Sequence, residues 1–263
     1  MGGDGQLVLA IDCGNTNTRF CLVQDLVLIA DWRRATDDRR TADEDLDWLR
    51  QLMAIVGLRV DSIRNVVIAS VRPQSTFGLK QLANKLIGRS ALVVGEGKVI
   101  LPTSNRLMVP GQVGADRLVN AVALNHGGYV PAIVVDFGTA TTFDYVDHEG
   151  LYGGGVIAPG VHNSQEALYQ AAAKLPRIEL LPNPEVLGND TISAMQSGVF
   201  WGYIGLVEGI VSRLKEELSE PIDVVATGGL AALFDSATEI FDRIDNNLTI
   251  TGLALVERHF GEV

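Results

Sequence analysis

Two segments from different halves of the chain carry the same pattern, and this repetition limits the folds that the sequence can adopt. The first is AIDCGNTNTRFCLV, Ala10–Val23, and the second is VVDFGTATTFDYV, Val134–Val146. Each runs from an apolar strand through an aspartate, any residue and a glycine into a threonine-containing turn, and then returns as an apolar strand. Each segment predicts a β-hairpin. Their presence in separate halves predicts a duplicated architecture with a ligand-binding cleft between the halves.

Apolar runs with the composition of buried strands recur along the chain. They are rich in Val, Ile and Leu, as strands covered on both faces are, and they occupy residues 7–11, 19–23, 65–70, 91–94, 132–136, 142–146 and 223–227. Helical patterns lie between them. One begins with a capping box, Thr41 and Glu44, and ends at Gly57. We therefore expect an α/β protein, and its 263 residues favour two domains, 1–126 and 127–263.

The longest predicted helix begins near Asp190 and Thr191 and carries an unusual row of glycines. These are Gly198, Gly202, Gly205 and Gly209, which share one helix face. Glycine costs a helix about 1 kcal/mol relative to alanine, so the row indicates that another backbone passes close by. That backbone belongs either to the same chain or to a second subunit, and packing rules do not separate the two.

Composition and charge exclude several classes of function. The net charge of −11 argues against nucleic-acid binding, which needs clustered Lys and Arg. No apolar run reaches the roughly 18 residues that span a bilayer, and the start MGGDGQ lacks the regions of a signal peptide, so we expect a cytoplasmic protein without a membrane partner. Cys13 and Cys21 lack metal-ligand spacing and are expected to be packing residues.

The two hairpin turns have the composition of a phosphate site. Gly, Asn and Thr supply unhindered backbone N–H groups and hydroxyls that can surround phosphate oxygens. Asp12 and Asp136 would repel a bare phosphate, so they favour a metal-nucleotide complex. One such turn alone is better interpreted as an ordinary hairpin turn, but the repetition reverses this preference and favours the site. Gly228-Gly229, after a later strand, either lets a nucleoside approach the backbone or makes a tight turn.

A candidate base lies in PGQVGADRLVNAVAL. Asp116 and Arg117 stand at the start of a predicted helix, after Gly114. A carboxylate there is either a helix cap or a general base that takes a hydroxyl proton during phosphoryl transfer. The residues alone leave both interpretations open.

Eight segments, taken in order, resemble the type III pantothenate kinases, a family within the superfamily of acetate and sugar kinases and actin-like ATPases. The segments are DCGNTNTRF, RTADE, VGADRLVNA, DFGTATTFD, GGGVIAPG, AAAKLPR, GNDTISAMQSGVFWGY and VVATGGLAALF, and they cover nearly the whole chain. The resemblance implies two ribonuclease-H-like domains and a homodimer. It also implies a kinase that transfers the γ-phosphoryl group of ATP to pantothenate, the first step of coenzyme A biosynthesis.

The same resemblance assigns roles to individual residues. Asp116 would be the proton acceptor, and Asp136 would bind a monovalent cation, potassium or ammonium, in addition to the Mg²⁺ that accompanies ATP. The implied ATP contacts are Asp12, Cys13, Gly14, Asn15, Thr16, Asn17, Thr18, Arg19 and Thr139. The implied pantothenate contacts are Gly114, Ala115, Asp116, Arg117 and Thr191.

Some positions depart from the family pattern. Leu107 and Val109 stand in a run where the family often has a tyrosine, which leaves open a kinase for another hydroxyl acceptor. A non-catalytic nucleotide-binding regulator is a further alternative, but Asp116 argues against it. Arg72 replaces a usual valine without an evident reason, and Lys174 and Arg177 are interpreted as structural.

Overall fold

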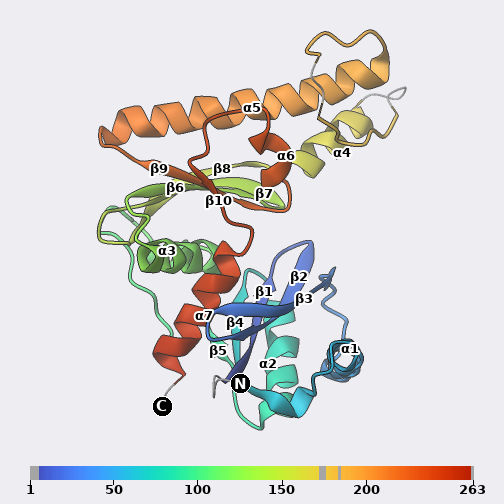
Figure 1. Cartoon of the computed structure of the whole chain (residues 1–263), viewed down its shortest axis with the longest axis vertical. Coiled ribbons are helices and arrows are strands. Elements are labelled where there is room, and N and C mark those ends of the chain that lie inside the picture. Colours follow the sequence, from blue (N-terminus) through green and yellow to red (C-terminus); the bar gives the residue numbers. More distant parts are fainter. Residues whose placement is uncertain (1–5, 172–175, 183–184, 262–263) are drawn as a thin grey trace. The chain divides into compact units, whose positions relative to one another are not determined.

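The computed structural model describes residues 6–171, 176–182 and 185–261, which form two compact units (Figure 1). Unit 1 comprises the chain up to Thr103, Leu107–His126 and the segment from Leu248 on, and unit 2 comprises Ser104–Arg106 and Gly127–Asn247. Each unit is built on its own five-stranded sheet. Within the described ranges, no helix has both the length and the apolar character that crossing a membrane requires.

The sheet of unit 1 has the strand order β3-β2-β1-β4-β5. Its strands are β1 (Leu7–Cys13), β2 (Asn17–Gln24), β3 (Val27–Ala35), β4 (Ile63–Ser70) and β5 (Leu92–Val93). β2 is antiparallel to β1 and to β3, whereas β4 runs parallel to β1 and to β5. Short hairpins connect the antiparallel strands, and helical crossovers connect the parallel ones.

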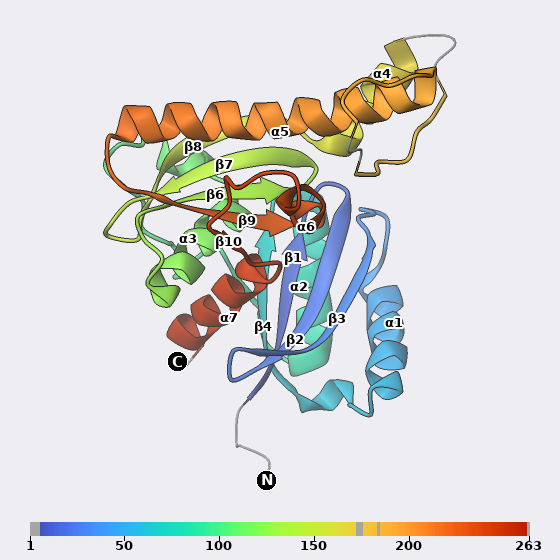
Figure 2. The same ribbon diagram turned by 45° about the horizontal axis from the view of Figure 1, so that its top comes forward.

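Helices cover both faces of this sheet, which explains why its central strands are almost continuously apolar (Figure 2). The helices of unit 1 are α1 (Ala42–Ile55), α2 (Pro73–Ile87), α3 (Ala115–Gly127) and α7 (Leu248–Phe260), with short 3₁₀ turns at Val60–Ser62 and Pro110–Gln112. Leu9 and Ile11 of β1 belong to the core that α1 and α2 cover. Val8 and Ala10 belong to the core that α3 and α7 cover on the opposite face.

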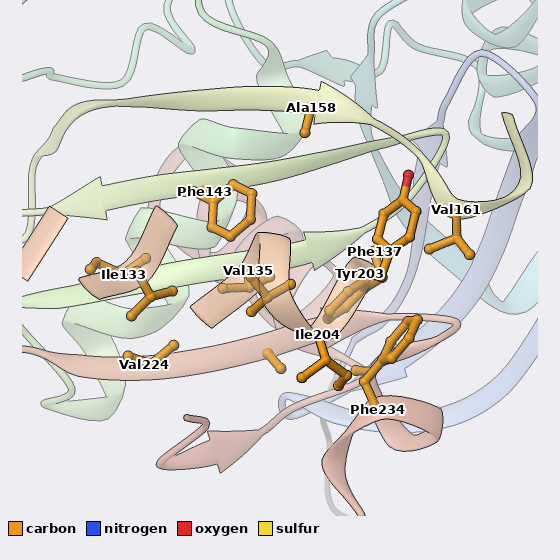
Figure 3. Packing of buried hydrophobic residues seen from close by; sticks show 14 of the residues in the cluster. Ile133, Val135, Phe137, Phe143, Ala158, Val161, Tyr203, Ile204, Val224 and Phe234 are labelled. Carbon is orange, nitrogen blue, oxygen red and sulfur yellow. The ribbon is translucent and has the colours of Figure 1, made fainter. Parts of the chain in front are cut away.

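Unit 2 repeats this sheet. Its strands are β6 (Ala132–Phe137), β7 (Ala140–Val146), β8 (Tyr152–Pro159), β9 (Asp223–Gly228) and β10 (Arg243–Ile244), and its helices are α4 (Val161–Ala171), α5 (Thr191–Leu218) and α6 (Ala231–Asp235). The order is β10-β9-β6-β7-β8. In its core, Phe143 and Val135 of the sheet pack with Tyr203 and Ile204 of α5 and Phe234 of α6 (Figure 3).

The two sheets have the same topology, so the predicted duplication is confirmed. In each, a first strand pairs antiparallel with the second, the second with the third, and parallel strands follow on the other side. Asp12 and Asp136 are each the penultimate residue of that first strand. The predicted fold class, α/β with two ribonuclease-H-like halves, is therefore correct.

The chain returns to unit 1 at its C-terminal end, which differs from the predicted division at residues 1–126 and 127–263. The units part at His126 and Gly127, but α7 belongs to unit 1. Its apolar face supplies Ile250, Leu253 and Val256 to the core beside β1 and β4. The burial of this face requires the sheet of unit 1, and no local pattern in the sequence reports that requirement.

The capping signals give the correct helix starts. The Thr41 hydroxyl accepts the Glu44 N–H, and the Glu44 carboxylate accepts the Thr41 N–H at 2.7 Å, ahead of α1. Asp190 caps α5 by accepting the Ser193 N–H at 2.9 Å.

Within the described part of the chain, no other segment packs against the row of glycines on α5. A methyl group at Gly198, Gly202 or Gly205 would meet no heavy atom within 4 Å, and at Gly209 it would approach only the end of the Arg213 side chain. No described segment of the same chain therefore accounts for the row.

Candidate active site

The first glycine-threonine loop follows β1 and is fixed by Thr36, a residue that the sequence analysis did not single out. The Gly14 N–H donates to the Asn17 carbonyl at 3.0 Å and closes the turn. Thr36 donates its hydroxyl to the Gly14 carbonyl and its N–H to the Thr16 carbonyl, both at 2.9 Å. The loop is thus held through its own backbone carbonyls, and its conformation does not depend on the side chains at its tip.

The residues expected to contact ATP at this loop differ in exposure. The tip, residues 15–17, is exposed. Cys13 and Thr18 are fully buried, and the Thr18 hydroxyl contacts the Cys13 sulfur at 3.5 Å. A ligand at the loop can therefore reach side chains of the tip, but only the backbone of Cys13 and Thr18.

A row of charged side chains crosses the sheet beside the loop. Asp12 of β1 pairs in register with Arg19 of β2, and Arg19 pairs with Arg33 of β3. Directly opposite residues of antiparallel strands point to the same face, so these three side chains share one face. Arg19 also holds Asp31 through two nitrogens, with Nη2 at 2.7 Å and Nε at 3.0 Å from the carboxylate. Arg33 and Asp31 were not predicted as site residues.

Asp12 and Asp116 lie close enough to repel each other electrostatically, although they are far apart in sequence. Burial, and after it repulsion from Asp116, raise the pKa of Asp12 to about 7, although Arg19 and Arg33 act in the opposite direction. Burial also raises the pKa of Asp116. The aspartate of the first loop and the candidate base therefore form one acidic pair inside unit 1.

The Asp116 carboxylate turns back over the start of its own helix. Its Oδ1 accepts the N–H of Arg117 at 2.9 Å, and this bond partly offsets the effect of burial on the pKa. Gly114 makes room for the carboxylate, because a methyl group there would lie 2.4 Å from Oδ1. Ala115, between them, is buried. The loop before α3 thus sets the position of the candidate base.

The second loop, in unit 2, surrounds Asp136 with glycines. The Gly138 N–H donates to the Ala140 carbonyl at 3.1 Å, and Thr139 is exposed at the tip. Gly228, at φ +91°, lies beside Asp136, because a methyl group there would come 2.7 Å from the Asp136 Oδ1 and the Phe137 carbonyl oxygen. Glycine is therefore needed at this position, because any side chain would clash with these two oxygen atoms.

The other predicted residues lie elsewhere. Thr191 is exposed at the first position of α5 and on a different element from Asp136 and Thr139. Arg177 pairs with Glu166 at 3.1 Å and lies over the ring of Tyr169, in agreement with a structural role. Lys174 lies outside the described residues.

The residues at which the sequence departs from the family pattern differ in their surroundings. Leu107 is half-buried and Val109 is 54% exposed. Arg72 forms an ion pair with Asp38, which also accepts a hydrogen bond from Ser75 at 2.5 Å. Arg72 thereby ties the segment before α1 to the start of α2, which gives this residue a structural reason.

The described residues contain no group of three or more His, Cys, Asp or Glu side chains that could hold a metal ion. A divalent cation at Asp12 would therefore need further ligands from a bound nucleotide or from water. Mg²⁺ commonly binds in this way, through one or two carboxylates and substrate phosphates.

The same strand topology occurs twice in one chain, each time with an aspartate ahead of a glycine-threonine turn, and this defines a duplicated α/β fold. Comparison with protein families is more specific. The family model for type III pantothenate kinase matches residues 8–213, and the chain belongs to this family.

Relatives named type III pantothenate kinase match nearly end to end. The protein from Paramagnetospirillum magneticum is 50% identical over 252 residues, covering 96% of this chain and 97% of its own. That from Cereibacter sphaeroides is 48% identical over 259 residues, covering 98% of this chain and 100% of its own.

Solved structures support the fold alone. A conserved putative Baf family transcriptional activator from Campylobacter jejuni has a TM-score of 0.60 at 18% identity, with 97% of this chain and 100% of that chain covered. A putative 2-dehydro-3-deoxygalactonokinase from Sinorhizobium meliloti has a TM-score of 0.58 at 15% identity, with 97% of each chain covered.

Proposed function

We propose that the protein transfers the γ-phosphoryl group of ATP to the primary hydroxyl of pantothenate in the cytoplasm and so begins coenzyme A biosynthesis. The observation that carries the proposal is the acidic pair: in a member of this family, Asp12 of the first loop and Asp116 of α3 come together in unit 1. A nucleotide-binding regulator has no need of a second carboxylate there.

In this reaction Asp116 accepts the proton as the hydroxyl oxygen of pantothenate attacks the γ-phosphorus. The new P–O bond forms while the bond to ADP breaks, and the hydroxyl proton passes to Asp116. The raised pKa of Asp116 strengthens it as a base, and the Arg117 N–H keeps one carboxylate oxygen in place. Gly114 to Arg117 form the acceptor side of the site, and Thr191 contributes from α5.

At the first loop, Asp12 would hold Mg²⁺, and the backbone of residues 13–18 would bind the phosphates of ATP. When bound, Mg²⁺ neutralises charge on the phosphate oxygens. At the second loop, Thr139 contacts ATP and Asp136 holds a monovalent cation. The Asp136 Oδ1 and the Phe137 carbonyl oxygen, which both lie close to Gly228, would be oxygen ligands for this ion. Replacing potassium by sodium should lower turnover or ATP affinity, and equal rates in both salts would contradict this cation site.

The protein acts as a homodimer joined along the glycine face of α5. The support is the open row of Gly198, Gly202 and Gly205, which no described part of the same chain covers. Helices with small residues on one face can approach each other closely.

The decisive experiment measures phosphopantothenate formed from ATP, Mg²⁺, potassium and pantothenate. Asp116→Asn should lower kcat by about 10²–10⁴-fold and leave ADP affinity nearly unchanged, because the change removes basicity and hardly alters shape. Equal loss of ADP binding would contradict the assignment of the base. ATP consumption with another hydroxyl compound, but not with pantothenate, would favour a different acceptor near the exposed Val109.

A further inference from the structure

At the first loop, two carboxylates lie beside the proposed site of a ligand that is also negatively charged. Asp12 and Asp116 form an acidic pair, and the triphosphate of ATP is strongly anionic. One Mg²⁺ ion does not balance this charge, so a protein cation is expected beside the loop. The sequence pattern points to Arg19 for this purpose.

Arg19 is already committed to another carboxylate. Its Nη2 lies 2.7 Å from Asp31 Oδ2, and its Nε lies 3.0 Å from both oxygens of the same carboxylate. The Arg19 side chain is only 14% exposed. A guanidinium held in this bidentate way is largely neutralised, so Arg19 orders β2 against β3 more than it attracts phosphate.

Arg33 occupies the next position in the same row, and its guanidinium is available to bind a ligand. It lies opposite Arg19 on β3, on the sheet face that carries Asp12. The residue is exposed, and its guanidinium makes no hydrogen bond or ion pair with the described residues. Its charge nevertheless acts at the site, because it lowers the pKa of Asp12 and of Asp31.

We propose that Arg33 binds the phosphate groups of the nucleotide at the first loop and supplies the positive charge that Arg19 cannot. This inference rests on the proposed function. The guanidinium is planar and has five donors, so it can hold phosphate oxygens in pairs, which a lysine ammonium cannot. Arg33 is thus a phosphate-binding residue in addition to those implied by the family resemblance.

The test compares the binding of adenosine, ADP and Mg²⁺-ATP by titration calorimetry. Arg33→Ala should weaken the binding of ADP and ATP by about tenfold to a hundredfold, the usual effect of losing a hydrogen bond to a charged group. It should leave the affinity for adenosine unchanged. The affinity of Arg33→Lys for ADP and ATP should fall between those of the wild type and Arg33→Ala. Arg50→Ala is the matched control, because Arg50 is an exposed arginine on α1 in the same unit, and this variant should bind all three ligands normally.

The outcomes separate the two proposals. If the wild type binds nucleotide and Arg33→Ala binds ADP as tightly, the role of Arg33 is wrong and the kinase proposal stands. Equal weakening of adenosine and ADP would also overturn a phosphate contact. If the wild type binds neither ADP nor ATP, both proposals fail. Arg33→Gln provides a second neutral variant should the alanine variant not fold, and circular dichroism verifies folding.

Discussion

At the scale of single residues, the candidate active site depends on side chains that are missing as much as on those that are present. The Asp116 carboxylate occupies the space that a methyl group on residue 114 would fill. In unit 2, the absent side chain of Gly228 similarly lets the backbone pass close to the Asp136 carboxylate. Glycine at these two positions allows the backbone to pass close to a carboxylate.

Gly114→Ala should therefore impair catalysis without abolishing nucleotide binding. The new methyl group would lie 2.4 Å from Asp116 Oδ1 and would displace the base. Because misplacing a catalytic group by about 1 Å can cost about 100-fold, we expect kcat to fall by that order, with ADP affinity within about twofold of the wild type. Gly111→Ala, in the same loop, is the control, since a methyl group there meets no atom within 4 Å. A normal kcat for Gly114→Ala would refute the proposed positioning.

Asp12 should make the stability of the protein depend on pH. Its pKa is raised from 3.8 to about 7, so the folded protein holds this proton more tightly than the unfolded chain does. The contribution of Asp12 to stability is therefore most favourable below pH 4 and is lost as the pH rises through about 7. Asp12→Asn should raise Tm by about 2 °C or more at pH 8 but not near pH 4. Thermal unfolding of this variant and of Asp47→Asn, an exposed site on α1, measures the difference. An equal shift at both pH values would contradict it.

At the scale of elements, strands buried on both faces can be predicted from sequence more readily than edge strands. β1, β4, β6 and β9 are central in their sheets, and their continuous apolar runs predict them. β3 was not predicted, because it is an edge strand whose exposure alternates along its length. β8 was also missed, since three glycines interrupt its pattern.

The same distinction applies to the candidate site. Asp12 and Asp116 follow from local motifs, a hairpin turn and a helix start, and the structure brings them together. Arg33 and Asp31 could not be found in this way, because their position depends on the register between β2 and β3. Thr36 was missed for the same reason, as it reaches the first loop only once β3 has paired.

Helix α5 permits a direct test of the dimer. Gly202→Leu adds a side chain where the single chain has open space, and replacing a helical glycine favours the helix by up to about 1 kcal/mol. We therefore expect the variant to stay folded but to elute as a monomer, as measured by light scattering after gel filtration. Glu216→Leu, also exposed on α5, should remain dimeric. A dimeric Gly202→Leu would place the subunit contact elsewhere.

At the scale of the whole molecule, the two units are built from the chain in different ways. Unit 2 is almost one continuous segment, whereas unit 1 gathers its sheet, α3 and the C-terminal α7 from separate parts. Gly252 lets α7 approach α3 closely, because a methyl group there would lie 2.0 Å from the Val119 carbonyl oxygen. The helix that carries Asp116 therefore rests against the last element of the chain.

The core of unit 1 should consequently be sensitive to changes in α7. Leu253 is fully buried, so Leu253→Ala should lower the free energy of unfolding by about 2–5 kcal/mol. Arg258→Ala, exposed on the same helix, should change it by less than about 0.5 kcal/mol. Urea denaturation distinguishes the two variants. A small effect of Leu253→Ala would show that α7 is dispensable for the core.

The return of α7 to unit 1 also sets the order in which the two units can be completed during synthesis of the protein. Domains fold as units while the ribosome releases the chain from its N-terminal end. Although the sheet of unit 1 is synthesised first, one of its faces is covered by α3 alone until α7 leaves the ribosome. Unit 2 has all of its strands and helices before that moment, so the half that begins later is the first that can be completed.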